Sequence, residues 1–255
     1  QKMMKQNVKG TANIVNLCLE HNIKKLGYIS SVAALGSVEE NKVRTEDDYW
    51  KESKSNTQYA ISKYLSEQEV WRGIEEGLKI LQKVKDQYGL PVITDVHEPW
   101  QCEPVANVVD IIQIPAFLCR QTDLIEAAAK TNKIIHVKKG QFLNAQSTIK
   151  VVEKFRAFGH TNKIILCERG TMFGYNDLVV DSRNLVWMRS PENLVSMDIT
   201  HCLQQPAQQH ADGTVKAGGL REFIPLMGKI ALVSGVDAIF MEIHDNPAEA
   251  KCDIH

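Results

Sequence analysis

From residue 90 onward, short apolar runs alternate with helical segments, and this alternation constrains the fold more than any other feature. The runs are nearly continuous in apolar character, which is typical of strands covered on both faces, as in a parallel sheet. Two intervening segments, 122–131 and 147–159, have a helical pattern, so the alternation predicts parallel βα units. The six expected strands are 90–96, 109–115, 133–139, 163–169, 194–200 and 237–243.

Charged or hydrogen-bonding side chains stand at the end of nearly every one of these strands. In an open doubly wound sheet, ligand-binding groups gather at a single switch point. In a barrel, the carboxyl ends of all strands open into one shared mouth. The even distribution favours the barrel, and a binding role for these residues over simple capping of strands and loops. The residues are Asp95, His97, Gln113, Lys138, Lys139, Glu168, Arg169, Asp198, His201, Glu242 and His244.

The first 77 residues are organised differently. We expect an amphipathic helix at 6–22, a strand that leaves into a loop at 23–36, and a second helix at 56–77. One strand and two helices are too little for a domain of their own. This part is therefore interpreted as a fragment with α-β-α order.

Three residues of this fragment could carry acid/base chemistry. Tyr59 and Lys63 stand four residues apart on one helical face, and Ser31 closes the expected strand. A Tyr beside a Lys, with a Ser hydroxyl opposite, suits hydride transfer to or from a carbinol. With the stretches NVKGTANIV and YISSVAALG, the trio resembles the middle of an extended short-chain dehydrogenase/reductase, the group that contains the NAD-dependent epimerases and dehydratases. No GxGxxG turn precedes it to hold a pyrophosphate, so we expect a vestigial trio and no NAD.

From about residue 75 onward the chain resembles the 3-deoxy-D-manno-octulosonate 8-phosphate synthases. The resemblance lies in long motifs that occur in order: EEGLKIL, ITDVHEP, DIIQIPAFLCRQTDL, HVKKGQF, ILCERGTMFGYNDLVVD, MDITHCLQQP, FMEIHDNP and KCD. It implies a (β/α)₈ barrel of the TIM type and an aldol-type condensation of phosphoenolpyruvate with D-arabinose 5-phosphate, releasing phosphate, in lipopolysaccharide sugar biosynthesis. It also implies a homo-oligomer, a tetramer. We divide the chain into a reductase-like fragment, 1–77, and a synthase-like portion, 78–255.

The resemblance also assigns roles to the polar residues. Phosphoenolpyruvate carries a carboxylate and a phosphate, which call for a planar Arg fork and a Lys point charge. Preorganised donors should sit where charge develops on the aldehyde and on the attacking water. The expected catalytic set is Lys138, Asp95, His97, His201 and Asp253, and the expected substrate-binding set is Lys138, Arg169, Gln113, Arg120 and Gln204. Arg120 resembles an arginine that reaches the sugar phosphate across a subunit interface.

A third set, His201, Glu242 and Asp253, joins an imidazole to two carboxylates and suits a divalent ion such as Zn²⁺, Fe²⁺ or Mn²⁺. By resemblance these are metal ligands in a metal-dependent branch, where a Cys on the first strand completes the set. In the metal-free branch that position is Asn. The first strand is not found here, so metal binding and direct hydrogen bonding to substrate or water both stay open.

The synthase-like portion lacks the family's first two strands and its last helix, so we expect an incomplete barrel of six strands. The expected strand at 26–31 with the helix at 57–77 could supply a seventh. The missing part includes a Lys and an Asn-Arg pair that grip the substrates, so we expect weak or absent synthase activity. A reductase fragment and a non-catalytic chimeric assembly unit are the alternatives, the latter because open strand edges invite association.

Composition argues against other classes of function. The chain has 30 Lys and Arg against 31 Asp and Glu, without a dense basic run, so no nucleic-acid partner is expected. No apolar run approaches the roughly 20 residues that span a bilayer. The polar, basic start is unlike a signal peptide, and the six cysteines are scattered with no CxxC pair, so we expect a cytoplasmic protein with reduced thiols.

Overall fold

The structure is a computed structural model that describes residues 2–21, 23, 26–36, 50, 53–175, 177–209, 215–244 and 246. These residues fall into two compact units, one within 1–89 and one within 90–255. No helix of the described part is long and apolar enough to cross a bilayer.

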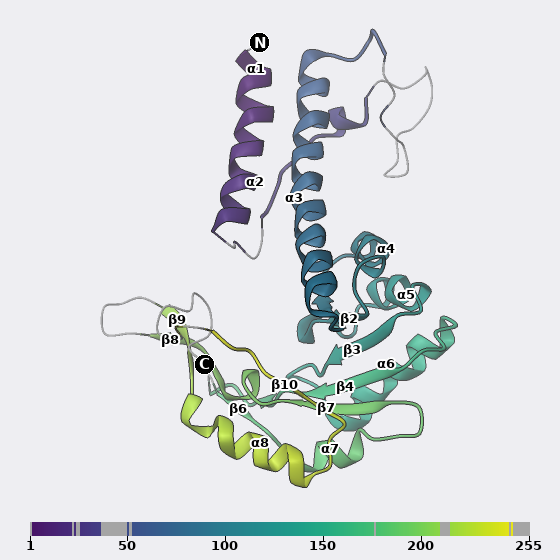
Figure 1. The fold of residues 1–255 in the computed structure, drawn as a ribbon, viewed down its shortest axis with the longest axis vertical. Helices are drawn as coiled ribbons and strands as arrows, with labels where there is room; N and C mark the ends of the chain where they lie inside the picture. The colour runs from purple at the N-terminus through teal and green to yellow at the C-terminus, as the bar shows by residue number, and fades with distance from the viewer. Residues whose placement is uncertain are drawn as a thin grey trace. The chain divides into compact units, whose positions relative to one another are not determined.

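The first unit is helical (Figure 1). One continuous helical segment consists of α1 (Lys2–Met4), the π-helix η1 (Lys5–Lys9) and α2 (Gly10–Glu20). It contacts the long helix α3 (Gln58–Tyr88), and so does the 3₁₀ turn η2 (Val32–Leu35). Thr57 caps the start of helix α3: its hydroxyl oxygen accepts a hydrogen bond from the backbone N–H of Ala60 at 3.1 Å.

Helices α2 and α3 approach closely at one point. A Cβ added at Gly73 of α3 would lie 2.7 Å from Cγ1 of Val15 on α2, and Val15 is buried. Beside it, Nη2 of Arg72 donates to Oδ1 of Asn16 at 2.7 Å. The contact therefore depends on the absence of a side chain at Gly73.

The strand expected at 23–36 is a wrong prediction for the residues described there. Residues 26–31 are assigned to no strand, and the side chain of Ile29 is 88% exposed. A lone strand has no neighbour to satisfy its backbone N–H and C=O groups. The helix expected to end at residue 77 instead continues to Tyr88.

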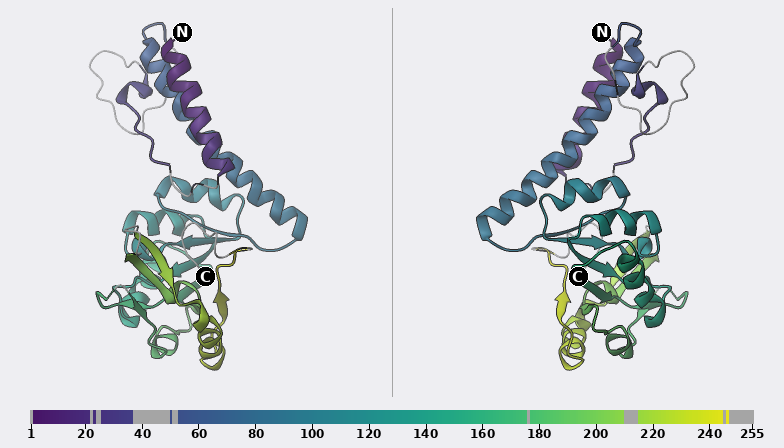
Figure 2. Two further views of the ribbon diagram at one scale, coloured as in Figure 1. Left: turned by 90° about the vertical axis from the view of Figure 1, so that its left-hand side faces the viewer. Right: turned by 90° about the vertical axis from the view of Figure 1, so that its right-hand side faces the viewer.

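The second unit is built on one parallel sheet that curls into a half barrel (Figures 1 and 2). Its order, β1-β2-β3-β4-β7-β10, follows the chain, and each neighbouring pair is parallel. All six strands lie within the runs expected from the sequence, so the mixed α/β class and the six-stranded sheet are confirmed. The strands are β1 (Ile93–Asp95), β2 (Ile111–Ile114), β3 (Ile134–Lys138), β4 (Ile164–Glu168), β7 (Leu194–Asp198) and β10 (Ala238–Phe240).

Helices and two hairpins accompany this sheet. Successive helices contact one another from α4 to α7, and apolar side chains such as Leu124, Phe155 and Ile135 are fully buried between helices and strands. The helices are α4 (Cys102–Ala106), α5 (Thr122–Lys130), α6 (Ala145–Ala157), α7 (Arg183–Trp187) and α8 (Ile224–Val233), with 3₁₀ turns η3 (Pro99–Gln101), η4 (Ala116–Leu118), η5 (His201–Leu203) and η6 (Arg221–Phe223). The antiparallel hairpins pair β5 (Thr171–Met172) with β6 (Leu178–Val179), and β8 (Gln204–Gln209) with β9 (Val215–Gly219).

Candidate active site at the carboxyl ends of the strands

The alternation of side chains along β3 separates an apolar face from a polar one. On β3, Ile135 and Val137 are fully buried on one face, while His136 and Lys138 point to the other. The strand register places Lys138 level with Cys167 of β4, and Phe240 of β10 level with Asp198 of β7. Polar groups from several strands are thereby gathered at the carboxyl end of the sheet.

Asp198 is the centre of this gathering. Its Oδ1 accepts hydrogen bonds from the backbone N–H of Thr200 (3.1 Å), the Thr200 hydroxyl (2.9 Å) and the backbone N–H of His201 (2.9 Å). Its Oδ2 contacts the Lys138 ammonium and lies 2.7 Å from Nδ1 of His201. Burial by itself would raise the pKa of Asp198, but the hydrogen bond from His201 and the positive charge of Lys138 outweigh it and hold the pKa well below its usual range. The residue is therefore a fixed anion that orients a cation and an imidazole.

Lys138 is held from a second side by an aromatic ring. Its Nζ lies 3.2 Å from the centroid of the Phe240 ring, and its side chain is 7% exposed. The Phe240 ring also lies near the His136 and His201 rings, with centroids 5.9 and 5.8 Å away. The Phe240 ring thus packs beside Lys138, His136 and His201.

His201 bridges two carboxylates. Its Nδ1 faces Asp198, and its Nε2 lies 2.9 Å from Oε2 of Glu242. Two ligands of one divalent ion are separated by about 3 Å, because each metal–ligand bond is about 2.1 Å long. This separation suits either a direct hydrogen bond between the two side chains or joint ligation of one divalent ion, and Asp198 orients the ring from behind in both cases. The third expected ligand, Asp253, lies outside the described residues, within which no group of three or more His, Cys, Asp or Glu side chains is arranged for a metal.

Arg169 and Gln204 form a second pair at the same end of the sheet. Arg169 follows the last residue of β4 and is 6% exposed. Its Nη2 donates to Oε1 of Gln204, the first residue of β8, at 3.3 Å. The structure therefore brings Lys138, Arg169, Gln204, His201 and Glu242 to the carboxyl ends of neighbouring strands.

The expected residues on and after β1 and β2 lie at the β1 edge of the sheet. Asp95, the last residue of β1, pairs in register with Gln113, and its Oδ2 lies 3.5 Å from Nε2 of His97. Oε1 of Gln113 contacts Nδ1 of His136 at 3.1 Å, and Nε2 of His136 contacts the Ser196 hydroxyl at 3.0 Å. Polar contacts therefore run across the sheet from β2 through β3 to β7. They lie one step closer to the amino ends of the strands than the charged side chains of Lys138 and Asp198.

Arg120 lies apart from these contacts. It stands between η4 and α5 with an exposed side chain, and its carbonyl oxygen accepts from Nζ of Lys154 at 3.2 Å. Among the described residues, the hydrogen bonds and ion pairs of the Lys138–Asp198–His201–Glu242 cluster do not include Arg120. The contacts of the described residues therefore do not connect Arg120 to this cluster.

From the sequence, Asp198 is expected only as one of the polar strand-end residues, without a specific role, and neither His136 nor Phe240 is expected in the site. The period-two pattern could have shown them, because Asp198 and Ser196, and likewise Lys138 and His136, share one face. Burial on both faces hid this pattern behind continuous apolar character.

The reductase-like trio is not assembled into one site by the contacts of the described residues. The Ser31 hydroxyl oxygen caps η2 by accepting from the backbone N–H of Ala33 at 3.2 Å. Nζ of Lys63 donates to the carbonyl oxygen of Ile29 at 3.1 Å, and Tyr59 is 42% exposed. These contacts give Ser31 and Lys63 structural partners.

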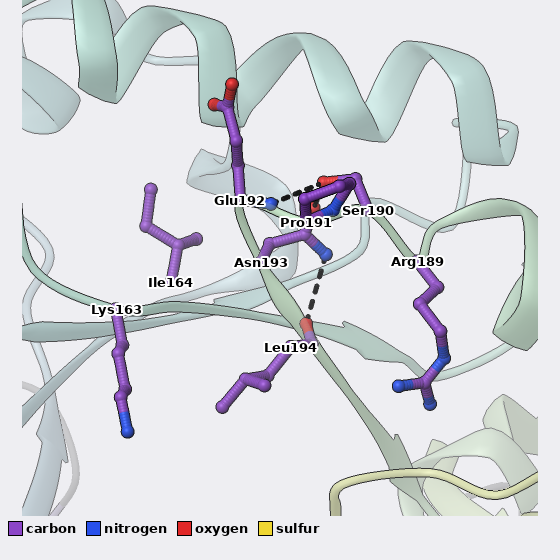
Figure 3. Close-up of a pocket in the computed structure, with 8 residues that line it drawn as sticks. All are labelled: Lys163, Ile164, Arg189, Ser190, Pro191, Glu192, Asn193 and Leu194. Atoms are coloured by element: carbon purple, nitrogen blue, oxygen red, sulfur yellow. Dashed lines mark hydrogen bonds between the residues drawn. The ribbon is translucent and has the colours of Figure 1, made fainter.

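A pocket of about 570 Å³ lies at the opposite end of the sheet (Figure 3). It adjoins Ile164 and Leu194, the first residues of β4 and β7. Within it, Nδ2 of Asn193 donates to the carbonyl oxygen of Leu194 at 3.2 Å. None of the expected site residues lines it, because they lie at the carboxyl ends of the strands.

Two sequence-family models match the chain, one over most of its length and one over its first part. The sequence model of the DAHP synthetase I family matches residues 66–255, and that of the NAD dependent epimerase/dehydratase family matches residues 1–82. The chain is 60% identical over 182 residues to a 2-dehydro-3-deoxyphosphooctonate aldolase of Pisum sativum and 59% identical over 182 residues to 2-dehydro-3-deoxyphosphooctonate aldolase 1 of Arabidopsis thaliana; each match covers 71% of this chain and 62% of the relative. A Fusobacterium nucleatum protein of the same name is 52% identical over 181 residues, covering 71% of this chain and 63% of the relative. The chain thus spans less than two thirds of the length of these curated relatives.

Proposed function

The chain belongs to the DAHP synthetase I family, and on that premise we propose that its second unit carries a synthase-type site for condensing phosphoenolpyruvate with D-arabinose 5-phosphate. Relatives named 2-dehydro-3-deoxyphosphooctonate aldolase support this choice of reaction, which serves lipopolysaccharide sugar biosynthesis. The observation that carries the proposal is the direct contact of Lys138, Asp198, His201 and Glu242 at the carboxyl ends of neighbouring strands.

In this proposal each group has a physical task. Lys138 and Arg169 bind the carboxylate and phosphate of phosphoenolpyruvate, because a buried anion needs fixed cations. The methylene carbon of phosphoenolpyruvate forms a C–C bond with the aldehyde carbon, whose oxygen takes up a proton. Water adds to the carbon that bears the phosphate and gives up a proton, and the C–O bond to the phosphate breaks to release inorganic phosphate and leave a ketone. The remaining expected residues, Asp95, His97, Gln113, Gln204 and His201, position the sugar and the water or move protons.

A divalent metal is a further part of the proposal. His201 and Glu242, with Asp253, would hold it, and it would supply Lewis-acid polarisation of the aldehyde or of water. Asp198 would keep Nδ1 of His201 protonated and the ring turned toward the ion. In the metal-free alternative, His201 and Glu242 contact substrate or water directly. No NAD is expected in either case.

The finer architecture and assembly are also proposals. The half barrel would be part of a (β/α)₈ fold of the TIM type, and the match to only part of each relative supports this. A seventh strand from residues 26–31 has no support in their observed unpaired conformation. A homo-oligomer, a tetramer by resemblance, would give the exposed Arg120 a neighbouring sugar phosphate to contact. A cytoplasmic location fits the unpaired thiols of the described cysteines.

We also propose that the chain joins two ancestries, residues 1–77 and 78–255. The two family matches overlap only at 66–82, and this overlap lies inside α3. The nucleotide sequence of the gene across Trp71 to Lys79 tests this proposal directly. An assembly of two unrelated reads would break there, whereas a natural fusion would continue.

Binding of phosphoenolpyruvate tests the proposed site. Calorimetric titration of the full chain should show binding that Lys138→Met weakens by about tenfold or more, since a hydrogen bond to a charged group is worth roughly 1.5–3 kcal/mol. Lys150→Met is the matched control, because Lys150 is exposed on α6 and pairs with Glu153. Phosphate release that depends on arabinose 5-phosphate should be weak or absent.

Two results would contradict this expectation. Equal affinities of the Lys138→Met and Lys150→Met variants would remove Lys138 from the site. Robust phosphate release would contradict the expected weak activity of this chain. Repeating the titration with Mn²⁺ and after chelation, together with elemental analysis of the purified chain, separates the metal-dependent from the metal-free alternative.

A further inference from the structure

Behind Arg169 lies a buried ion pair that the proposed reaction does not use. Lys139 and Glu168 are both fully buried, and Nζ of Lys139 lies 3.4 Å from Oε1 of Glu168. A buried pair costs desolvation energy that must be offset by good geometry and further hydrogen bonds. The contacts around the pair meet that requirement.

The two side chains hold the backbone on both sides of Gly170. The N–H of Gly170 donates to Oε1 of Glu168 at 2.6 Å, and the carbonyl oxygen of Gly170 accepts from Nζ of Lys139 at 3.2 Å. The second oxygen of Glu168 accepts from Nδ2 of Asn184 at 2.9 Å. Because the Gly170 N–H belongs to the peptide bond formed by Arg169, these contacts fix the main chain from which the Arg169 side chain extends.

Further oxygens complete the environment of the Lys139 ammonium. Nζ donates to the carbonyl oxygens of Leu143 (3.2 Å) and Gly140 (3.4 Å) and to the Thr171 hydroxyl (3.1 Å). The ammonium therefore ties the loop after β3 to the loop after β4. These are the loops that follow Lys138 and Glu168, the last residues of the two strands.

The conformation at Gly170 explains why the loop needs an external hold. Its φ is +90°, a region that favours glycine, and a Cβ there would lie 3.0 Å from Cβ of Leu178. Glycine loses more conformational freedom on folding than any other residue, so contacts from both sides are required to keep one conformation.

We propose that Lys139, Glu168 and Asn184 are positioning residues that hold Arg169 in the orientation in which it binds an anion. The inference rests on the proposed function of Arg169. It does not require the three residues to touch the substrate, because they act on the backbone at Gly170. We call the contacts of these three residues around Gly170 the backbone clamp. A displacement of about 1 Å in a group that binds the reacting anion lowers its effectiveness strongly, so loss of the clamp should weaken anion binding.

A cycle of four chains measures this effect: the wild type, Glu168→Gln, Arg169→Ala and the double variant. In calorimetric titrations with phosphoenolpyruvate, Glu168→Gln should weaken binding by about tenfold in the wild-type background. It should have almost no effect in the Arg169→Ala background, because Glu168 acts through Arg169. Equal losses in both backgrounds, or no loss in either, would overturn the proposal.

A rescue variant tests the hydrogen-bond network itself. Glu168→Gln places an amide NH₂ beside the NH₂ of Asn184, whereas the pair Glu168→Gln with Asn184→Asp restores a donor, an acceptor and one negative charge. The pair should recover most of the lost affinity, and a failure to recover it in a folded variant would contradict the network. Glu153→Gln, at an exposed carboxylate of α6, is the control for lost charge.

Hydrogen exchange separates this inference from the proposed function. The amide of Gly170 should exchange faster in Glu168→Gln than in the wild type and recover in the rescue pair, while Glu153→Gln should leave it unchanged. Wild-type exchange in Glu168→Gln would overturn the clamp even if phosphoenolpyruvate binds. If the wild type fails to bind phosphoenolpyruvate but the exchange results hold, the proposed function fails and the backbone clamp stands. Asn184→Ala is the milder variant for the same measurement should Glu168→Gln not fold.

Discussion

The carboxylate of Asp198 makes five contacts at the centre of the candidate site, three through Oδ1 and two through Oδ2. Each contact comes from a group that is itself fixed by β7, by η5 or by the end of β3. A carboxylate so fully engaged is an organiser and not a mobile base. In the proposed reaction, the reactive roles would therefore fall to Lys138, His201 and their neighbours.

One layer below this cluster, His136 predicts how stability depends on pH. Burial first, and then the positive charge of Lys138, lower its pKa from 6.5 to about 3, so the folded protein holds a neutral imidazole. The unfolded chain binds the proton first as the pH falls. The stabilisation is therefore present above about pH 6.5 and is lost toward pH 3, by at most about 1.4 kcal/mol per pH unit.

Urea unfolding at pH 7, 6, 5 and 4 checks this expectation. The free energy of unfolding should fall with pH more steeply in the wild type than in His136→Gln, which does not titrate. Acidic residues titrate in both proteins, so the difference between the two slopes isolates His136. Parallel pH dependences in the two proteins would contradict a neutral buried imidazole.

At the scale of elements, the strands were predictable and the first unit was only partly so. Continuous runs such as 133–139 and 163–169 contain β3 and β4, because strands buried on both faces have a strong apolar signal. The segment 26–31 also has strand-like composition, but a strand needs a partner that no local pattern reports. The polar residue types at the strand ends could likewise be read from the sequence. Their contacts with Asp198 and Phe240 depend on the register between neighbouring strands, which could not.

The crossing of α2 and α3 gives a prediction at this scale. Gly73→Ala improves helix propensity by about 1 kcal/mol, but its Cβ would lie 2.7 Å from Cγ1 of Val15, and overpacking costs about 1–3 kcal/mol. We expect a net loss in the free energy of unfolding, measured by denaturant titration of the helical signal. Combining it with Val15→Ala should cost less than the sum of the two single changes.

Gly77→Ala is the matched control in the same helix. A Cβ at Gly77 meets nothing within 4 Å, so the substitution should stabilise α3 by up to about 1 kcal/mol. Equal stabilisation by Gly73→Ala and Gly77→Ala would contradict the close approach of α2 and α3 at Gly73.

At the scale of the molecule, the half barrel has two edges. Within the described residues β1 pairs only with β2, and β10 pairs only with β7. The apolar side chains of Ile239, Met241 and Ile243 are 43%, 53% and 78% exposed at the β10 edge. Unpaired edges with apolar side chains favour association with another chain.

We expect the purified chain to self-associate, and Ile239→Lys to reduce this, because a charge on an edge strand opposes further pairing. Light scattering at several protein concentrations measures the mass. Val186→Lys is the control, since Val186 is 62% exposed on α7 and belongs to no strand. A mass that neither substitution changes, or that both change alike, would argue against the β10 edge as the point of association.

If the chain joins two ancestries as proposed, the unbroken course of α3 from Gln58 to Tyr88 bears on how such a chain can fold. A helical main chain repeats the same i to i−4 ladder whatever side chains it carries. A crossover inside a long helix therefore inherits a continuous backbone without a new turn or spacer, and only the phase of its apolar stripe decides whether it packs. Helices shared by two parents are accordingly the segments where recombination damages folding least, and where junctions in other composite proteins should be sought.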